Sequence, residues 1–186
     1  LTGIGQAGLQ VLPLYGHLVA HLPLGPVVVA RVPDLGLEGY ELFGAPELLA
    51  DLWRRAVQAG ATPAGLEAWD IARIEAGRPE WGVDINDTAL AQEANLDELH
   101  AISYTKGCYT GQETVARVHF RGHVNRHLRG LRTSHPEALP AGAQLVDGTG
   151  RAVGDVRSAT LSPRLGNIAL AMVRREVELG GTLDCR

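Results

Sequence analysis

Residues 27–60 read VVVARVPDLGLEGYELFGAPELLADLWRRAVQAG, and their hydrophobic pattern changes period part-way along. The segments 27–32 and 39–43 are short apolar or β-branched runs bounded by proline and glycine, which predicts two strands. Over residues 46–59 apolar side chains recur at the i, i+1, i+4 and i+5 spacing of a helix, with a proline in the first turn and Gly60 after the end. This stretch therefore predicts two strands followed by an amphipathic helix.

The sequence around this stretch predicts more strands and helices. Residues 9–14 are a further strand candidate. Residues 63–76 predict a second helix, with Thr62 as N-cap and Pro63 at the first helical position. Strands followed by helices favour an α+β layer over a doubly wound parallel sheet. Residues 78–105 lack a strong period, which is typical of a functional loop or a linker.

The last third of the chain has a different sequence pattern. Three short strand candidates, at 145–147, 152–158 and 167–173, are separated by turn-forming pairs rich in glycine, aspartate and proline. Several short strands at this spacing favour a small β-barrel. We therefore expect two domains, an α+β domain over residues 1–121 and a β-barrel over residues 122–186.

The composition is that of an ordinary globular protein. Of 186 residues, 45% are hydrophobic and 20% are charged, which excludes disordered, collagen-like and coiled-coil chains. No apolar run approaches the ~20 residues of a transmembrane helix, and a formal net charge of -4 argues against a general nucleic-acid binder. Two cysteines, Cys108 and Cys185, are too few for a disulfide framework, so we expect a reducing, cytoplasmic setting. Because the one methionine is Met172, we expect a piece of a longer protein.

The densest cluster of unusual residues is the octapeptide KGCYTGQE at residues 106–113. Thr110 and Glu113 have the spacing of a capping box, which predicts a helix over about residues 111–120. The alternation of apolar and basic side chains over residues 116–121 leaves a strand as the alternative.

Lys106 and Cys108 give the octapeptide its chemistry. Lys106 is the single lysine of the chain, and its ammonium is a compact point charge that arginine does not reproduce. Cys108 comes just before the predicted helix, where free N–H groups and the positive end of the dipole favour an anion. We therefore expect a more reactive thiol than that of Cys185, the alternative being an inert cysteine in a tight turn.

Residues 114–134 carry five arginines and three histidines but no acidic residue. Such a segment attracts anions, although a solvated charged face has the same composition. His119, His123 and His127 are spaced as on one side of a helix, but Gly122 interrupts the helix between them. We therefore predict no metal site.

The octapeptide, with the VAR and RG that follow at residues 115–117 and 121–122, closely resembles the signature of the YgfZ-type proteins. These belong to the GcvT superfamily of folate-binding proteins, which includes the aminomethyltransferase (T-protein) of the glycine cleavage system. Supporting stretches are GYEL at 39–42, RIEAG at 73–77 and VGDVRS at 153–158. The resemblance covers nearly the whole chain from about Leu24 and lacks the superfamily's N-terminal part.

The resemblance implies the ferredoxin-like portion of the GcvT fold followed by a small C-terminal β-barrel, with tetrahydrofolate or a one-carbon derivative as cofactor. In the T-protein the glutamate at the position matched by Glu41 contacts the pterin, so Glu41 is the candidate pterin anchor. A carboxylate can accept two hydrogen bonds from an amino-pyrimidine edge. The resemblance also implies Cys108 and Lys106 as catalytic residues. The further candidates for cofactor binding are Arg73, Tyr109, Gln112, Glu113 and Arg117.

Two functions follow from the resemblance. The first is a tetrahydrofolate-binding protein that supports iron-sulfur cluster assembly or repair, and a tRNA modification dependent on it, with iron-sulfur proteins as clients. The alternative is a folate-dependent aminomethyltransferase of the glycine cleavage type. The first is favoured because the octapeptide contains a cysteine and because Ala68-Trp69-Asp70 departs from the A-R-D of aminomethyltransferases. A third hypothesis is direct tRNA binding through Arg117, Arg121, Arg126 and Arg129; whether the protein turns over as an enzyme is left open.

Overall fold

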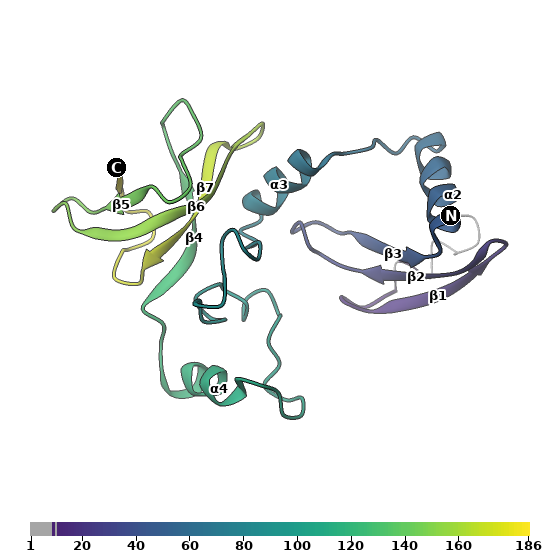
Figure 1. Cartoon of the computed structure of the whole chain (residues 1–186), viewed down its shortest axis with the longest axis horizontal. Helices are drawn as coiled ribbons and strands as arrows, with labels where there is room; N and C mark the ends of the chain where they lie inside the picture. The colour runs from purple at the N-terminus through teal and green to yellow at the C-terminus, as the bar shows by residue number, and fades with distance from the viewer. Residues whose placement is uncertain (1–8, 10) are drawn as a thin grey trace. The chain divides into compact units, whose positions relative to one another are not determined.

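The structure is a computed structural model that describes residue 9 and residues 11–186. The chain divides into two compact units, Leu1–Ala72 and Arg73–Arg186 (Figure 1). Each unit contains a β-sheet with its own hydrophobic core. Among the described residues, no helix has the length and apolar character needed to cross a membrane.

The first unit is built on a three-stranded antiparallel sheet. Its strands are β1 (His17–Leu22), β2 (Gly25–Arg31) and β3 (Tyr40–Gly44), in the order β1-β2-β3. Strands β2 and β3 confirm the two strands predicted over residues 27–32 and 39–43. The sequence prediction omits β1, although exposed and half-buried residues alternate along it with the strand period of two.

The strand predicted over residues 9–14 is wrong for the residues that the structure describes there. The backbone N–H of Leu12 donates to the carbonyl of Leu9 at 3.3 Å, and that of Gly16 donates to the carbonyl of Pro13 at 2.8 Å. These local bonds make turns, which take the place of a strand ladder. Gln10, also within that prediction, lies outside the described residues.

Two helices follow the first sheet. Helix α2 (Pro46–Gln58) confirms the helix predicted over residues 46–59, and its Leu48 and Leu52 pack against Val27 and Val29 of β2. Helix α3 (Leu66–Glu75) begins three residues after the predicted start at Pro63. Its first i to i+4 bond runs from the N–H of Trp69 to the carbonyl of Gly65, at 3.2 Å. Because Gly65, two residues after Pro63, disfavours a helical backbone, Thr62 and Pro63 precede α3 and do not cap it.

The second unit contains a five-stranded antiparallel sheet in the order β4-β7-β6-β5-β8. The strands are β4 (Arg126–Arg132), β5 (Gln144–Val146), β6 (Ala152–Ser162), β7 (Gly166–Arg174) and β8 (Asp184–Cys185). Strands β5, β6 and β7 confirm the strands predicted over residues 145–147, 152–158 and 167–173. The sequence prediction omits β4, because its arginines were assigned to a charged patch, whereas Leu128 within it is buried.

Strand β7 is an interior strand of this sheet, because β4 pairs on one side of it and β6 on the other. Both of its faces are covered: Leu170 belongs to one core cluster and Ala171 to another. A β-carbon on Gly154 of β6 would lie 2.5 Å from the carbonyl oxygen of Met172. Only glycine therefore permits this close approach of β6 to β7.

Helix α4 (Gln112–Arg121) confirms the helix predicted over about residues 111–120, and rules out the strand alternative. The predicted capping box is wrong, since no side chain caps α4. Gly111 occupies the N-cap position at φ 85°, a left-handed conformation that favours glycine. Thr110 is thereby one residue too early to cap the helix. Gly122 ends it, as predicted.

Candidate functional site

Glu41 lies on the face of the first sheet that points away from α2. Its neighbours Tyr40 and Leu42 pack with the core between sheet and α2, and side chains alternate between the two faces of a strand. Glu41 and Phe43 therefore share the opposite face, where both are exposed. We call this side of β1, β2 and β3 the open face.

The strand register places Glu41 at the edge of an apolar surface. Ala30 of β2 pairs with Glu41. The next pair of β3 on the same face is Phe43 with Val28, which pairs in turn with Val19 of β1. The side chains of Val19 and Phe43 are 52% and 54% exposed. A carboxylate beside such a surface can accept hydrogen bonds from the edge of a flat heteroaromatic ring whose face contacts the apolar row.

A buried ionic network fixes the end of α3 within the second unit. Arg73 Nη1 donates to Asp84 Oδ2 at 2.6 Å and Arg73 Nη2 donates to Ser158 Oγ at 2.9 Å. The Ser158 hydroxyl donates to Asp84 Oδ1 at 2.7 Å, and the backbone N–H of Glu80 donates to Asp84 Oδ2 at 2.8 Å. Asp84 is fully buried and Arg73 is 5% exposed. The network thus joins α3, the following loop and β6 through satisfied buried charges.

The network also defines the surroundings of Arg73, which the resemblance assigns to cofactor binding. Besides Asp84 and Ser158, its guanidinium meets the carboxylate of Glu80 at 3.2 Å. The side chain of Glu80 is half exposed, so this last contact lies toward the surface. The assignment of Arg73 to cofactor binding stays a prediction.

Residues 106–111 of the octapeptide form a turn before α4, and its last two residues begin the helix. Cys108 and Lys106 are both exposed. The Lys106 ammonium lies over the ring of Tyr109, 4.9 Å from its centroid, a cation–π contact. The hydroxyl of Tyr109 is buried and makes no hydrogen bond among the described residues. The structure thus associates Lys106 with Tyr109, while the catalytic roles of Lys106 and Cys108 remain predictions.

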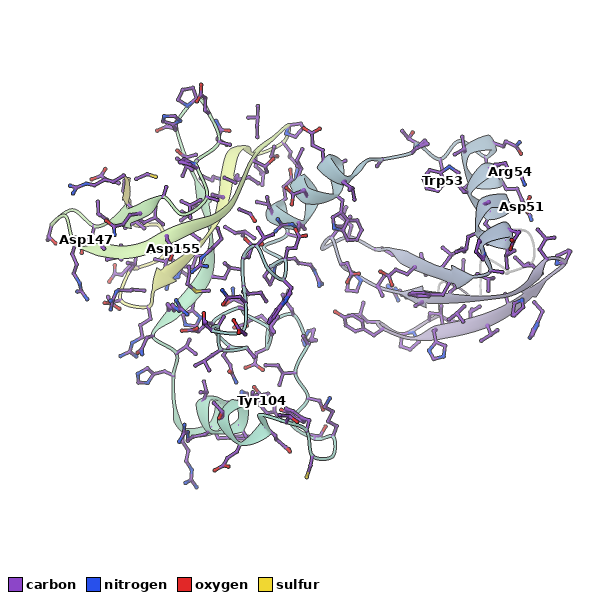
Figure 2. All side chains as sticks on the ribbon, in the orientation of Figure 1. Asp51, Trp53, Arg54, Tyr104, Asp147 and Asp155 are labelled. Atoms are coloured by element: carbon purple, nitrogen blue, oxygen red, sulfur yellow. The ribbon has the colours of Figure 1, made fainter. Side chains whose placement is uncertain are left out.

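Tyr104 is the centre of a polar and aromatic cluster that joins the loop to α4 (Figure 2). Its hydroxyl donates to Asp97 Oδ1 at 2.6 Å, and its ring stacks on His119 of α4 with centroids 3.9 Å apart. Asp97 Oδ2 in turn lies 3.5 Å from His119 Nδ1. Gln92, 8% exposed, donates to the carbonyl of Val115 at 2.8 Å. These contacts hold α4, and with it the octapeptide, against the loop.

Burial raises the pKa of Tyr104 above its ordinary value, and the hydrogen bond to Asp97 raises it further. The phenol therefore stays protonated at neutral pH and can act as the donor to Asp97. Sequence reasoning missed this cluster. Asp97 and Tyr104 lie in the segment 78–105, which was predicted to be a functional loop or a linker but contains no motif.

The remaining predicted residues lie on α4, where Gln112 is half-buried and Glu113 and Arg117 are exposed. The basic segment does not form one surface. Arg126 Nε binds Glu93 Oε1 at 2.9 Å, and Arg129 donates to the carbonyl of Val177. Only part of the basic segment is therefore available to an external anion.

The interaction of Glu75 with two neighbours gives a pH-dependent contribution to stability. Hydrogen bonds from Ser162 and from Arg164, whose Nη2 lies 2.6 Å from Glu75 Oε2, lower the pKa of this carboxyl. Its contribution is present above the ordinary carboxyl pKa and is lost as the pH falls through the lowered value. We predict that Glu75→Gln reduces the loss of unfolding free energy between pH 7 and pH 3.5, measured by urea titration. Glu98→Gln, at an exposed glutamate, is the control; equal losses in both variants would contradict the prediction.

Two family comparisons match most of the chain. Residues 6–104 match the GCVT N-terminal domain, and residues 126–186 match the glycine cleavage T-protein C-terminal barrel domain. The chain belongs to the glycine cleavage T-protein (GcvT) family. Proteins of this family use tetrahydrofolate as the one-carbon acceptor. The boundary predicted between residues 121 and 122 stays a prediction.

The relatives confirm the fold class and the superfamily. An aminomethyltransferase from Nostoc sp. is 37% identical over 169 residues, which are 90% of this chain and 44% of the relative. One from Rippkaea orientalis is 35% identical over 98% of this chain and 49% of the relative. The glycine cleavage system aminomethyltransferase T of Bartonella henselae shares the fold at a TM-score of 0.76 and 23% identity, over 95% of this chain and 51% of that chain. The GcvT-family chain thus spans about half the length of these relatives.

These comparisons correct the functional prediction. Proteins that are 30–37% identical over most of the chain are named aminomethyltransferase. The predicted main function, support of iron-sulfur cluster assembly and of tRNA modification, is therefore wrong, and the alternative stated with it is favoured. The comparisons support the GcvT superfamily but not the YgfZ-type assignment. An octapeptide was given more weight than similarity spread over the whole chain.

Proposed function

We propose that this chain is part of a folate-dependent aminomethyltransferase of the glycine cleavage type, with tetrahydrofolate as the acceptor of the one-carbon unit. The observation that carries the proposal is the similarity to aminomethyltransferases over as much as 98% of the chain. Matches to both family domains, in order along one chain, support it.

The residues of the open face fit the pterin ring of tetrahydrofolate. Glu41 would hold the amino-pyrimidine edge, since an ionised carboxylate accepts two hydrogen bonds from adjacent N–H groups. Phe43 and Val28 offer the apolar contact that a flat ring needs beside that carboxylate. Tetrahydrofolate supplies the nitrogen nucleophiles that accept the one-carbon unit, and the part of Glu41 is to orient the ring and exclude water from its edge.

In the second unit we propose the residues named from the resemblance. Cys108 and Lys106 are the catalytic candidates, because an exposed thiol and an ammonium can each hold or release a proton. The candidates for cofactor binding are Arg73, Tyr109, Gln112, Glu113 and Arg117. Iron-sulfur clients and tRNA form no part of the proposal. A cytoplasmic setting, inferred from two unpaired cysteines, is proposed with it.

Two measurements test the proposed function. Isothermal titration of tetrahydrofolate into the chain should give saturable binding of one equivalent. In a reconstituted glycine cleavage reaction, the protein containing this chain should accelerate glycine-dependent formation of methylenetetrahydrofolate. Binding without turnover would leave a folate-binding protein and remove the transferase, whereas absence of saturable binding would remove the folate site.

A further inference from the structure

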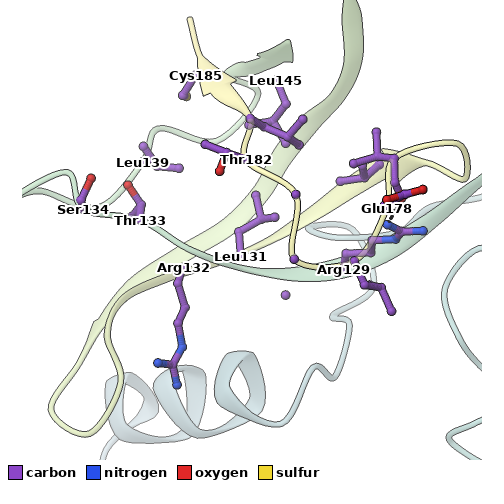
Figure 3. Close-up of a pocket in the computed structure, with 17 residues that line it drawn as sticks. Arg129, Leu131, Arg132, Thr133, Ser134, Leu139, Leu145, Glu178, Thr182 and Cys185 are labelled. Carbon is purple, nitrogen blue, oxygen red and sulfur yellow. Dashed lines mark hydrogen bonds between the residues drawn. The ribbon is translucent and has the colours of Figure 1, made fainter. Parts of the chain in front are cut away.

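The second unit contains a cavity of about 380 Å³, and Figure 3 draws the residues that line it. Because Val173 of β7 lines it and side chains alternate along a strand, the cavity lies on the face of the sheet that carries Ala169, Ala171 and Val173. Strand β4 and the segment 177–185 line it together. Its volume falls within the range of about 300–1,000 Å³ that is usual for small-molecule sites. The cavity is unrelated to the open face and to the octapeptide, so neither the family comparisons nor the proposed function assigns it a ligand.

The strand register explains why there is space here. Arg129 and Leu131 of β4 pair with Ala171 and Ala169 of β7, whose side chains are small and fully buried. The neighbours of Arg129 and Leu131 on β7 are therefore alanines, which leave space that bulkier side chains would fill. Leu145 of β5 also belongs to the lining, and Figure 3 shows Arg129 apart from Leu131 and Leu145.

Arg129 brings a guanidinium to the lining of the cavity. Its Nη1 donates to the carbonyl of Val177, a neutral acceptor. Among the residues that the structure describes, this guanidinium forms no salt bridge, and Arg132 adds a second guanidinium to the lining. A guanidinium has five N–H donors and stays charged at any physiological pH. Glu178 also lines the cavity, without forming an ion pair with Arg129.

We propose that this cavity binds a small monocarboxylate with an apolar tail. The carboxylate would be held by the free N–H groups of Arg129, in a charge-assisted pair that can be bidentate. The tail would contact Leu131, Leu139 and Leu183, which are partly exposed apolar side chains of the lining. The hydroxyls of Thr133, Ser134 and Thr182 lie around the same cavity and add polar contacts at its rim. Glu178 opposes an anion, which sets an upper limit on affinity and offers a test.

The two cysteines allow the site to be tested within one molecule. Cys185 lines the cavity, whereas Cys108 does not, and both thiols are exposed. The probe is octanoate, with octanol as the neutral control of equal chain length, and the reporter is alkylation by iodoacetamide resolved by peptide mass spectrometry. Saturating octanoate should slow alkylation of Cys185 at least fivefold and leave Cys108 unchanged, while octanol slows neither cysteine more than twofold. Equal protection of both cysteines, or equal protection by octanol, would overturn the proposal.

Three variants separate charge from packing. Arg129→Gln should abolish protection of Cys185, Arg129→Lys should retain part of it, and Glu178→Gln should lower the octanoate concentration for half-protection severalfold. Thermal unfolding of each variant checks its fold. If Arg129→Gln does not fold, the other two variants still decide, because unchanged protection in both would exclude an anion site. Tetrahydrofolate binding is measured separately, so failure here leaves the proposed function intact.

Discussion

Replacing Asp84 by alanine should lower the free energy of unfolding of the second unit by about 3–5 kcal/mol, the range for breaking a buried ion pair. The variant leaves the Arg73 guanidinium buried without its counter-charge and removes the acceptor of the Ser158 hydroxyl. Urea unfolding followed by circular dichroism measures the loss.

Asp155→Ala is the matched control for this variant. Asp155 and Arg157 also form a close ion pair, at 2.6 Å, but their side chains are 39% and 24% exposed. An exposed pair contributes about 0–1 kcal/mol, because water and salt screen it. Similar losses in the two variants would show that burial of the Arg73 network adds nothing.

Replacing Glu41 by glutamine should weaken tetrahydrofolate binding by about 1–3 kcal/mol, since the amide offers one oxygen acceptor and turns a donor toward the pterin edge. At about 1.4 kcal/mol for each factor of ten, the dissociation constant should rise roughly 5- to 150-fold. The charge change alone is tested by Glu47→Gln, at an exposed glutamate in the first turn of α2. Unchanged affinity in a folded Glu41 variant would remove Glu41 from the site while leaving folate binding established.

The sequence predicted those strands and helices whose hydrophobic pattern is contained within the element itself. The change of period over residues 27–60 predicted β2, β3 and α2 because one face of each element is buried. The alternation along β1 was overlooked because histidines occupy two of its exposed positions. Strand β4 was read as a patch of arginines, although β7 buries its Leu128.

The candidate site was harder to predict because its contacts are distant in sequence. Arg73 and Ser158 are separated by 85 positions, and no periodicity relates them. Glu41 was singled out through family resemblance, and its apolar neighbours follow from strand register, which a single sequence does not specify. The octapeptide predicted a helix correctly but indicated the wrong function. A motif of eight residues is weaker evidence of function than similarity over most of the chain.

The strands of the barrel differ in their resistance to local opening, because β7 is an interior strand and β8 is an edge strand. A strand paired on both sides and covered on both faces separates only when the unit as a whole unfolds. Strand β8, by contrast, comprises two residues at the sheet edge, held by pairing with β5 alone. Fraying of this edge would detach the segment ending at Cys185 while leaving the arrangement of β4, β7 and β6 intact. We therefore expect the amide hydrogens of β8 to exchange with solvent sooner than those of β7, without unfolding of the core.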